Sequence, residues 1–179
     1  NMMMLGAVLN SHFWLIVHVL VITAGYAVCL LCSLVAYLVL LRPTTPAEKL
    51  QSHPFYPVMI RSALAALALT ATGTVLGGIW ADQSWGRFWG WDPKENGALL
   101  IVIWLAWALH ARLTEFIAGP WVPAAFALTG VCVALSWFGV NLLGVGLHSY
   151  GFTEGAFTGL MAFIIGNILA LAILIKRWN

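Results

Sequence analysis

Five long apolar stretches, separated by short polar segments, run through this chain of 179 residues. One helical crossing of a bilayer needs about 20 mostly apolar residues, and each stretch is about that long or longer. The pattern predicts an all-α, polytopic membrane protein with about five transmembrane helices, forming a single membrane domain over residues 1–179. The stretches are residues 13–41, 58–79, 94–116, 122–140 and 157–175.

The composition excludes a soluble domain. Hydrophobic residues make up 62% of the chain and charged residues only 8%, whereas soluble domains carry charge on about a quarter of their residues. The net charge of +2 is scattered among the polar breaks, so we expect contact with membrane lipid and no nucleic-acid partner. Residues 1–12 lack a basic leader and a full span follows, so we expect no cleavable signal sequence.

The basic residues predict an orientation. With five crossings, most of them fall on one side, which the positive-inside tendency makes the cytoplasmic or stromal side, together with the C-terminus. Arg87 and Lys94 fall on the other side. The segment 80–97 and the loop 141–156 are therefore predicted to face the periplasm or the thylakoid lumen, as is the N-terminus. The inner basic residues are Arg42, Lys49, Arg61, Arg112, Lys176 and Arg177.

The most unusual polar break is the stretch WADQSWGRFWGWDPKEN at residues 80–96. Interfacial tryptophans commonly anchor a membrane protein, but this many, interrupted by two glycines, also suit a platform for a planar ligand. Both interpretations stay open on composition alone. We expect an external loop or a short interfacial helix with an aromatic face. The segment contains four of the ten tryptophans in the chain, Trp80, Trp85, Trp89 and Trp91.

The end of this segment carries a helix-start signature. Asp92 is a favoured N-cap, Pro93 suits the first helical position, and Glu95 completes a capping box. The third apolar stretch is therefore predicted to begin as a helix directly after Asp92.

Two histidines are predicted to lie at the same membrane face as the tryptophans. His18 is near the outer end of the first span, and His148 lies in an apolar, glycine-rich outer loop. Two imidazoles beside an aromatic platform are typical of bis-histidine haem ligation. Arg87 and Lys94 flank the aromatics and suit the haem propionates, with simple solvation as the alternative.

Three further histidines are interpreted differently. His12 and His53 are expected to be solvated or interfacial. His110 lies within the third span near its inner end, where an ionisable group is a functional candidate. It is too far from the outer pair to share an iron, so it predicts a second, inner haem position. The partner histidine would come from another segment or subunit.

Small residues within the spans are expected to pack helices together. Cys29 and Cys32 form a C-x-x-C motif, but a c-type haem attachment site would need histidine in place of Ser33. Gly73-x-x-x-Gly77 is a close-packing pattern.

Together these motifs resemble the haem-handling proteins of cytochrome c biogenesis. W-G-x-x-W-x-W-D-P-K-E, followed by a span ending in L-H-x-R, looks like the signature called the WWD domain, most similar to the CcsA type and related to CcmC and CcmF. The contexts S-x-F-W-L-x-x-H-V and N-L-L-G-x-G-L-H-S-Y-G, around His18 and His148, agree with it. The resemblance covers residues 12–152.

The resemblance implies transport of haem b and its display at the outer platform between His18 and His148. The implied platform comprises Trp80, Trp85, Arg87, Trp89, Trp91, Asp92 and Lys94. An apocytochrome c presents a C-x-x-C-H motif, whose thiols add to the vinyl groups of reduced haem to form thioethers. His110 matches one histidine of the family's inner pair. The other precedes the first span of this chain, so we expect either a C-terminal fragment or a different inner site.

No residue in the chain resembles a nucleophile, so a role within a holocytochrome c synthase (haem lyase) would be one of positioning. The implied partners are the apocytochrome and a CcsB-like subunit. Two other classes remain as alternatives. One is a membrane subunit that keeps a bis-histidine b-type haem for electron transfer. The other is a transporter or scaffold in which the tryptophans only anchor.

Overall fold

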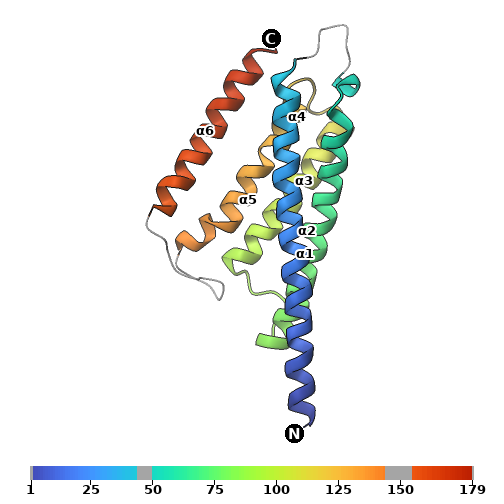
Figure 1. Cartoon of the computed structure of the whole chain (residues 1–179), viewed down its shortest axis with the longest axis vertical. Coiled ribbons are helices and arrows are strands. Elements are labelled where there is room, and N and C mark those ends of the chain that lie inside the picture. The colour runs from blue at the N-terminus through green and yellow to red at the C-terminus, as the bar shows by residue number, and fades with distance from the viewer. Residues whose placement is uncertain (1, 44–49, 144–154, 179) are drawn as a thin grey trace.

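The computed structural model describes the backbone of residues 2–43, 50–143 and 155–178. Within these ranges the regular elements are all helices, and no strand occurs, which confirms the predicted fold class. Figure 1 shows them as a bundle of roughly aligned long helices. In chain order they are α1 (Met2–Leu41), η1 (Leu50–Ser52), α2 (Tyr56–Trp85), α3 (Pro93–Leu113), α4 (Trp121–Ala127), α5 (Thr129–Trp137), η2 (Gly139–Leu143) and α6 (Ala156–Lys176).

Four of these helices, α1, α2, α3 and α6, are long and apolar enough to cross a membrane. The expected span at residues 122–140 differs, because it is formed by the shorter apolar pair α4 and α5. Side chains of neighbouring helices bond to carbonyls just before the break: Trp104 Nε1 donates to Ala125 O at 3.0 Å and Ser33 Oγ donates to Ala127 O at 2.6 Å. A side chain bonded into the helical ladder is a common cause of such a break.

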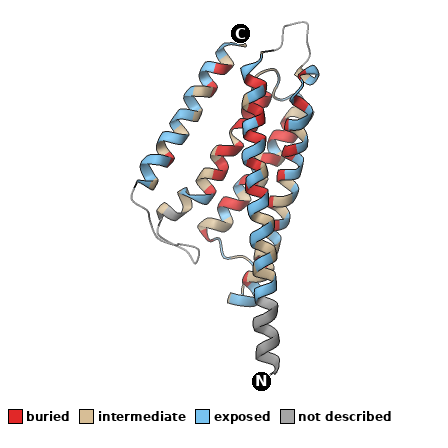
Figure 2. Cartoon of the chain, in the orientation of Figure 1, coloured by how far each residue is buried: buried red, intermediate tan, exposed pale blue. Residues whose placement is uncertain are grey.

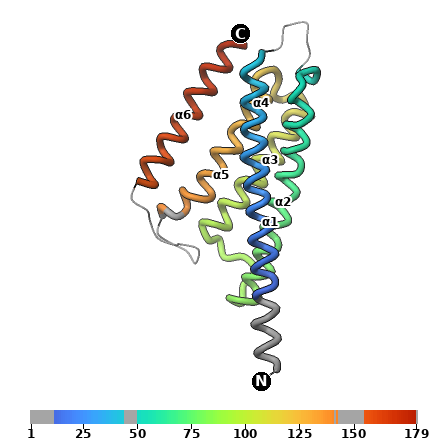
Figure 3. Tube along the Cα trace, in the orientation of Figure 1, coloured from blue at the N-terminus to red at the C-terminus, as the bar shows by residue number. Residues whose placement is uncertain are grey.

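The core lies between α1, α2, α3 and the α4–α5 pair, as the buried positions in Figure 2 show. Phe126 of α4 is the largest fully buried side chain, and Leu40, Met59 and Ile101 from three other helices are also fully buried. α6 lies at the edge of the bundle, where Figure 3 shows it beyond α5. Its buried residues are few, and Tyr37 of α1 donates a hydrogen bond to Asn167 Oδ1 at 2.7 Å.

The cysteines are part of this core. Cys29, Cys32 and Cys132 are free and buried. The interpretation of the C-x-x-C motif as helix-packing residues is confirmed.

The two ends of the bundle differ in composition. α2 ends and α3 begins at one end, which we call the aromatic end because residues 80–96 form it. The C-terminal ends of α1, α3 and α6 and the first turn of α2 lie at the opposite end (Figure 1). The described basic residues follow this division. Arg87 and Lys94 are at the aromatic end, and Arg42, Arg61, Arg112, Lys176 and Arg177 are at the opposite end.

Candidate functional site

The tryptophan segment is part helix and part loop. α2 continues to Trp85, so Trp80 and Trp85 are on its last turns, and Gly86 ends the helix with a left-handed φ of 69°. Residues 86–92 form a loop, so the short interfacial helix that the sequence also allowed is wrong for this stretch. Glycine reaches this backbone conformation without a steric cost, whereas Trp91, with φ 57°, does not.

The predicted start of α3 is confirmed. Asp92 Oδ1 accepts a hydrogen bond from Lys94 N at 3.0 Å, and Glu95 Oε2 accepts one from Asp92 N at 3.1 Å. The Asp92 side chain also accepts from the backbone N–H of Glu95, and this bond together with the one from Asp92 N to Glu95 Oε2 makes the capping box. It fixes the direction in which the loop enters the helix.

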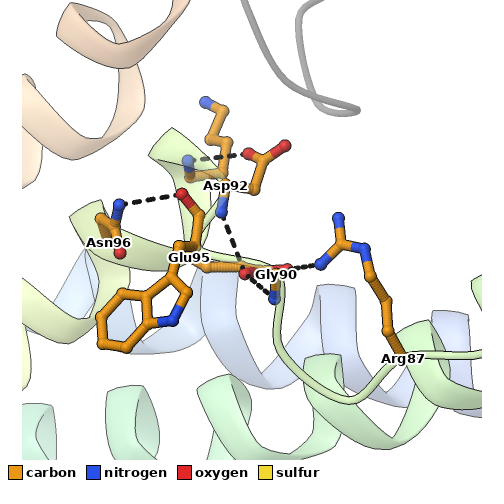
Figure 4. A network of polar contacts seen from close by, with 7 residues as sticks. Arg87, Gly90, Asp92, Glu95 and Asn96 are labelled. Atoms are coloured by element: carbon orange, nitrogen blue, oxygen red, sulfur yellow. Dashed lines mark hydrogen bonds and ion pairs between the residues drawn. The ribbon is translucent and has the colours of Figure 1, made fainter.

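Glu95 also organises the loop before the cap, as Figure 4 shows. Its Oε2 accepts a second bond from Gly90 N at 2.8 Å, and its Oε1 pairs with Arg87 Nη1 at 3.1 Å. The Arg87 guanidinium lies directly against Gly90, where an added Cβ would be only 1.5 Å from Nη1. One carboxylate therefore ties three positions of the loop to the first turn of α3.

A cavity of about 320 Å³ opens beside this loop, between α1, α2, α3 and the end of α5. We call it the aromatic cavity. Ligand cavities commonly have volumes of about 300–1,000 Å³. Its wall is mainly apolar and aromatic, with a few polar groups. The residues that line it are His18, Val19, Ile22, Thr23, Tyr26, Thr74, Gly77, Gly78, Trp80, Ala81, Phe88, Trp89, Lys94, Glu95, Ala98 and Trp137.

His18 forms part of this wall and is held by α2. Its Nδ1 lies 2.8 Å from the carbonyl oxygen of Gly73. A carbonyl only accepts, so Nδ1 carries the proton, and in the neutral ring Nε2 then carries the lone pair. A backbone carbonyl on the remote nitrogen is a common way to orient a metal-binding histidine.

The structure divides the four tryptophans of the segment. Trp80 and Trp89 line the aromatic cavity, whereas Trp85 and Trp91 do not. The rings of Trp85 and Trp80 meet edge-on with their centres 4.7 Å apart, and those of Trp91 and Trp89 meet edge-on with their centres 5.9 Å apart. The Trp91 residue is 69% exposed. The rings thus form two edge-on pairs, and only one member of each pair lines the cavity.

The polar groups of the cavity suit an anionic ligand with a flat, apolar body. The buried Nε1–H of Trp89 has no hydrogen-bond partner among the described residues. Lys94 Nζ donates to Trp137 O at 2.7 Å, and an ammonium carries three donors, so it retains capacity for a carboxylate. Arg87 is paired with Glu95 and lies 5.7 Å from the Trp85 ring centre, outside the cavity wall.

None of the other histidines that the structure describes lines the aromatic cavity. His148 lies outside the described residues. His110 is exposed near the end of α3, with Nδ1 donating to Ala106 O at 2.7 Å, far along the helix from the aromatic end. His12 is exposed as expected. His53, expected to be solvated or interfacial, is not solvated, because only 3% of its surface is exposed and its ring centre lies 5.9 Å from that of Phe55.

Sequence reasoning missed several lining residues. Trp137 comes from the end of α5, and its ring contacts Tyr26 of α1 at 5.6 Å. Phe88 reaches the cavity because its ring rests on Gly78, where a Cβ would lie 2.6 Å from the ring. The paired glycines 77 and 78, one turn before Trp80, were the one local signal that could have indicated a side chain packed against this face.

Comparison with known proteins gives a consistent result. The family model described as cytochrome C assembly protein matches residues 5–148. The cytochrome c biogenesis protein CcsA of Parasynechococcus marenigrum is 34% identical over 175 residues, covering 79% of this chain and 56% of the relative. CcsA of Prochlorococcus marinus strain NATL1A is also 34% identical, covering 77% and 55%.

The protein NrfI of Wolinella succinogenes is also similar to this chain. It is 37% identical over 147 residues, covering 78% of this chain but only 16% of NrfI. The chain thus spans just over half the length of its CcsA relatives and a small part of NrfI. The family match covers most of the chain, so this polytopic membrane protein belongs to the cytochrome c assembly protein family.

Proposed function

We propose that the chain binds haem b in the aromatic cavity and presents it for covalent attachment to an apocytochrome c. The observation that carries the proposal is the position of His18, which lines an aromatic cavity with its Nδ1 held by a backbone carbonyl. The family membership and the relatives named for cytochrome c biogenesis support it.

The residues of the cavity fit a haem. His18 Nε2 would ligate the haem iron, and His148 is proposed as the second iron ligand. Trp80, Trp89 and Trp137 supply apolar walls for the macrocycle. The unpartnered N–H of Trp89 and the ammonium of Lys94 would hold a propionate, since charge-assisted hydrogen bonds to carboxylates are strong.

In this proposal haem is the substrate, and the chain acts by positioning. Each cysteine thiol of the C-x-x-C-H motif adds across a haem vinyl group, so one S–C bond forms, the thiol hydrogen ends on the neighbouring vinyl carbon, and no group leaves. Holding the thiol and the vinyl group close together in the correct orientation can account for much of the rate of thioether formation. A CcsB-like subunit would complete the holocytochrome c synthase.

We further propose that the aromatic end faces the periplasm or the lumen. The division of the described basic residues between the two ends supports this orientation by the positive-inside tendency. His110, exposed at the opposite end, is proposed to hold haem at an inner position together with a histidine from outside this chain.

The first experiment compares haem content in purified variants. We expect His18→Ala and His148→Ala to lose most of the pyridine-extractable b-type haem, whereas His12→Ala, an exposed histidine on the same helix, keeps it. Unchanged haem in the His18→Ala/His148→Ala double variant would refute the ligand assignment.

The second experiment separates haem attachment from electron transfer. The chain is co-expressed with its partner subunit and an apocytochrome c. Attachment predicts covalent c-type haem on the apocytochrome, which should be lost with His18→Ala. Bound haem without any covalent product would instead favour an electron-transfer subunit.

A further inference from the structure

We propose that Gly73 and Gly77 of α2 are positioning residues that set the tautomer and the place of the His18 imidazole. The inference rests on the proposed haem function, which it deepens. It starts from a motif that otherwise indicates only helix packing. The two glycines are four residues apart, so they lie one above the other on the same face of α2, and that face meets α1 at His18 and Ile22.

Gly77 provides the space for the ring. A Cβ at this position would lie 2.7 Å from His18 Cε1, 2.9 Å from Nδ1 and 3.3 Å from Nε2. The first two distances are shorter than side-chain atoms tolerate, so any larger residue at 77 displaces the imidazole. The imidazole therefore lies directly against the backbone of α2 at this position.

Gly73 provides the orientation. Its carbonyl oxygen, one turn earlier in α2, accepts the Nδ1–H bond of 2.8 Å. A Cβ at Gly73 would lie 2.9 Å from Ile22 Cα, so the missing side chain also lets α1 approach closely enough for this bond. The helix backbone thus performs the role that a carboxylate performs beside many metal-binding histidines. It keeps the proton on Nδ1 and the lone pair on Nε2.

The test uses Gly77→Ala, because its added methyl meets the imidazole, whereas a methyl at Gly73 meets the backbone of α1. The matched control is Gly166→Ala on α6, where a Cβ would have open space around it. Loss of an outer-shell partner typically lowers metal affinity by about 10- to 100-fold. We expect a decrease of that size in haem affinity for Gly77→Ala, with a shifted haem absorption spectrum, and no change for Gly166→Ala. Wild-type haem affinity and spectrum in Gly77→Ala would overturn the proposal.

A second pair of variants separates positioning from general packing. In a His18→Ala background, haem binding is restored with added imidazole, and Gly77→Ala is then introduced. An imidazole that is not tied to α1 can move away from the added methyl, so if Gly77 acts through the fixed His18 ring, the substitution has little effect in this background. A loss of similar size there would show a packing defect and overturn the proposal.

A measurement without haem keeps the inference separate from the proposed function. Nitrogen-15 NMR of histidine-labelled protein, with His18→Ala to assign the signal, reports which ring nitrogen carries the proton. We expect the Nδ1–H tautomer at His18 in the wild type and in Gly166→Ala, and its loss in Gly77→Ala. This result would stand even if the wild type bound no haem. A wild-type Nε2–H tautomer would overturn the inference, whatever the haem content.

Discussion

The Glu95 carboxylate offers the sharpest test of how the loop at residues 86–92 is held. Its side chain is only 11% exposed, and it accepts bonds from Gly90 N, Asp92 N and Arg87 Nη1. Glu95→Gln preserves the shape but removes the charge. An amide oxygen in the position of Oε2 keeps both backbone bonds, and the amide NH₂ then faces the Arg87 guanidinium, donor against donor.

The magnitude follows from the number and kind of bonds. Hydrogen bonds to charged groups contribute about 1.5–3 kcal/mol and neutral ones about 0.5–1.5 kcal/mol, so two converted bonds lose about 2 kcal/mol. The ion pair adds at most about 1 kcal/mol, since the Arg87 side chain is 32% exposed and solvent screens the pair. The loss at the two backbone bonds alone, about 2 kcal/mol, corresponds to about 30-fold more frequent opening of the loop, and the ion pair can only add to it.

Amide hydrogen exchange measures this opening directly. We expect the Gly90 and Asp92 amides to exchange about 30-fold faster in Glu95→Gln, from the energies above. The control is Glu115→Gln, an exposed carboxylate at the opposite end of the bundle, which should leave both amides unchanged. Exchange at wild-type rates in Glu95→Gln would refute the claim that this carboxylate holds the loop.

Two further substitutions test the cavity and the core. Trp89→Phe removes the unpartnered N–H but keeps an aromatic ring. Haem affinity should therefore fall about 10-fold, as for one lost hydrogen bond to a charged group, while the stability of the haem-free protein stays unchanged. The control is Trp91→Phe, at a side chain that is 69% exposed, which should change neither quantity. Equal haem affinities for the two variants would contradict a propionate contact at Trp89. Phe126 is fully buried, so Phe126→Ala should lower the free energy of unfolding by about 3–5 kcal/mol, measured by denaturation in detergent. The control is Phe163→Ala, at a side chain that is 42% exposed. A decrease in the free energy of unfolding no larger than that of the control would contradict this prediction, since neighbouring side chains would then have filled the space left by Phe126.

Local features of the sequence determined the class of protein and several details. Apolar runs of membrane-spanning length predict helices whatever their neighbours, because no unpaired backbone group is tolerated in lipid. The helix start at Asp92 was equally predictable, since the capping box joins residues only three apart. Gly73 and Gly77 correctly indicated a close helix contact for the same reason, as their spacing places them on one face.

The tertiary structure alone decided which of these residues meet. Sequence spacing could not show that Trp80 and Trp89 face the cavity while Trp85 and Trp91 do not, because that depends on where α2 ends and on the path of the loop after it. Trp137 joins the wall through the packing of α5 against α1 and α3.

The break between α4 and α5 also depends on neighbours, since Trp104 and Ser33 reach it from other helices. The same holds for the carbonyl of Gly73, which bonds to a histidine 55 residues away in the chain. Hydrophobic periodicity fixes the length and apolar character of a helix. The rotation and depth at which it meets its neighbours come from side-chain packing across the bundle, and those two quantities place the polar atoms of the site.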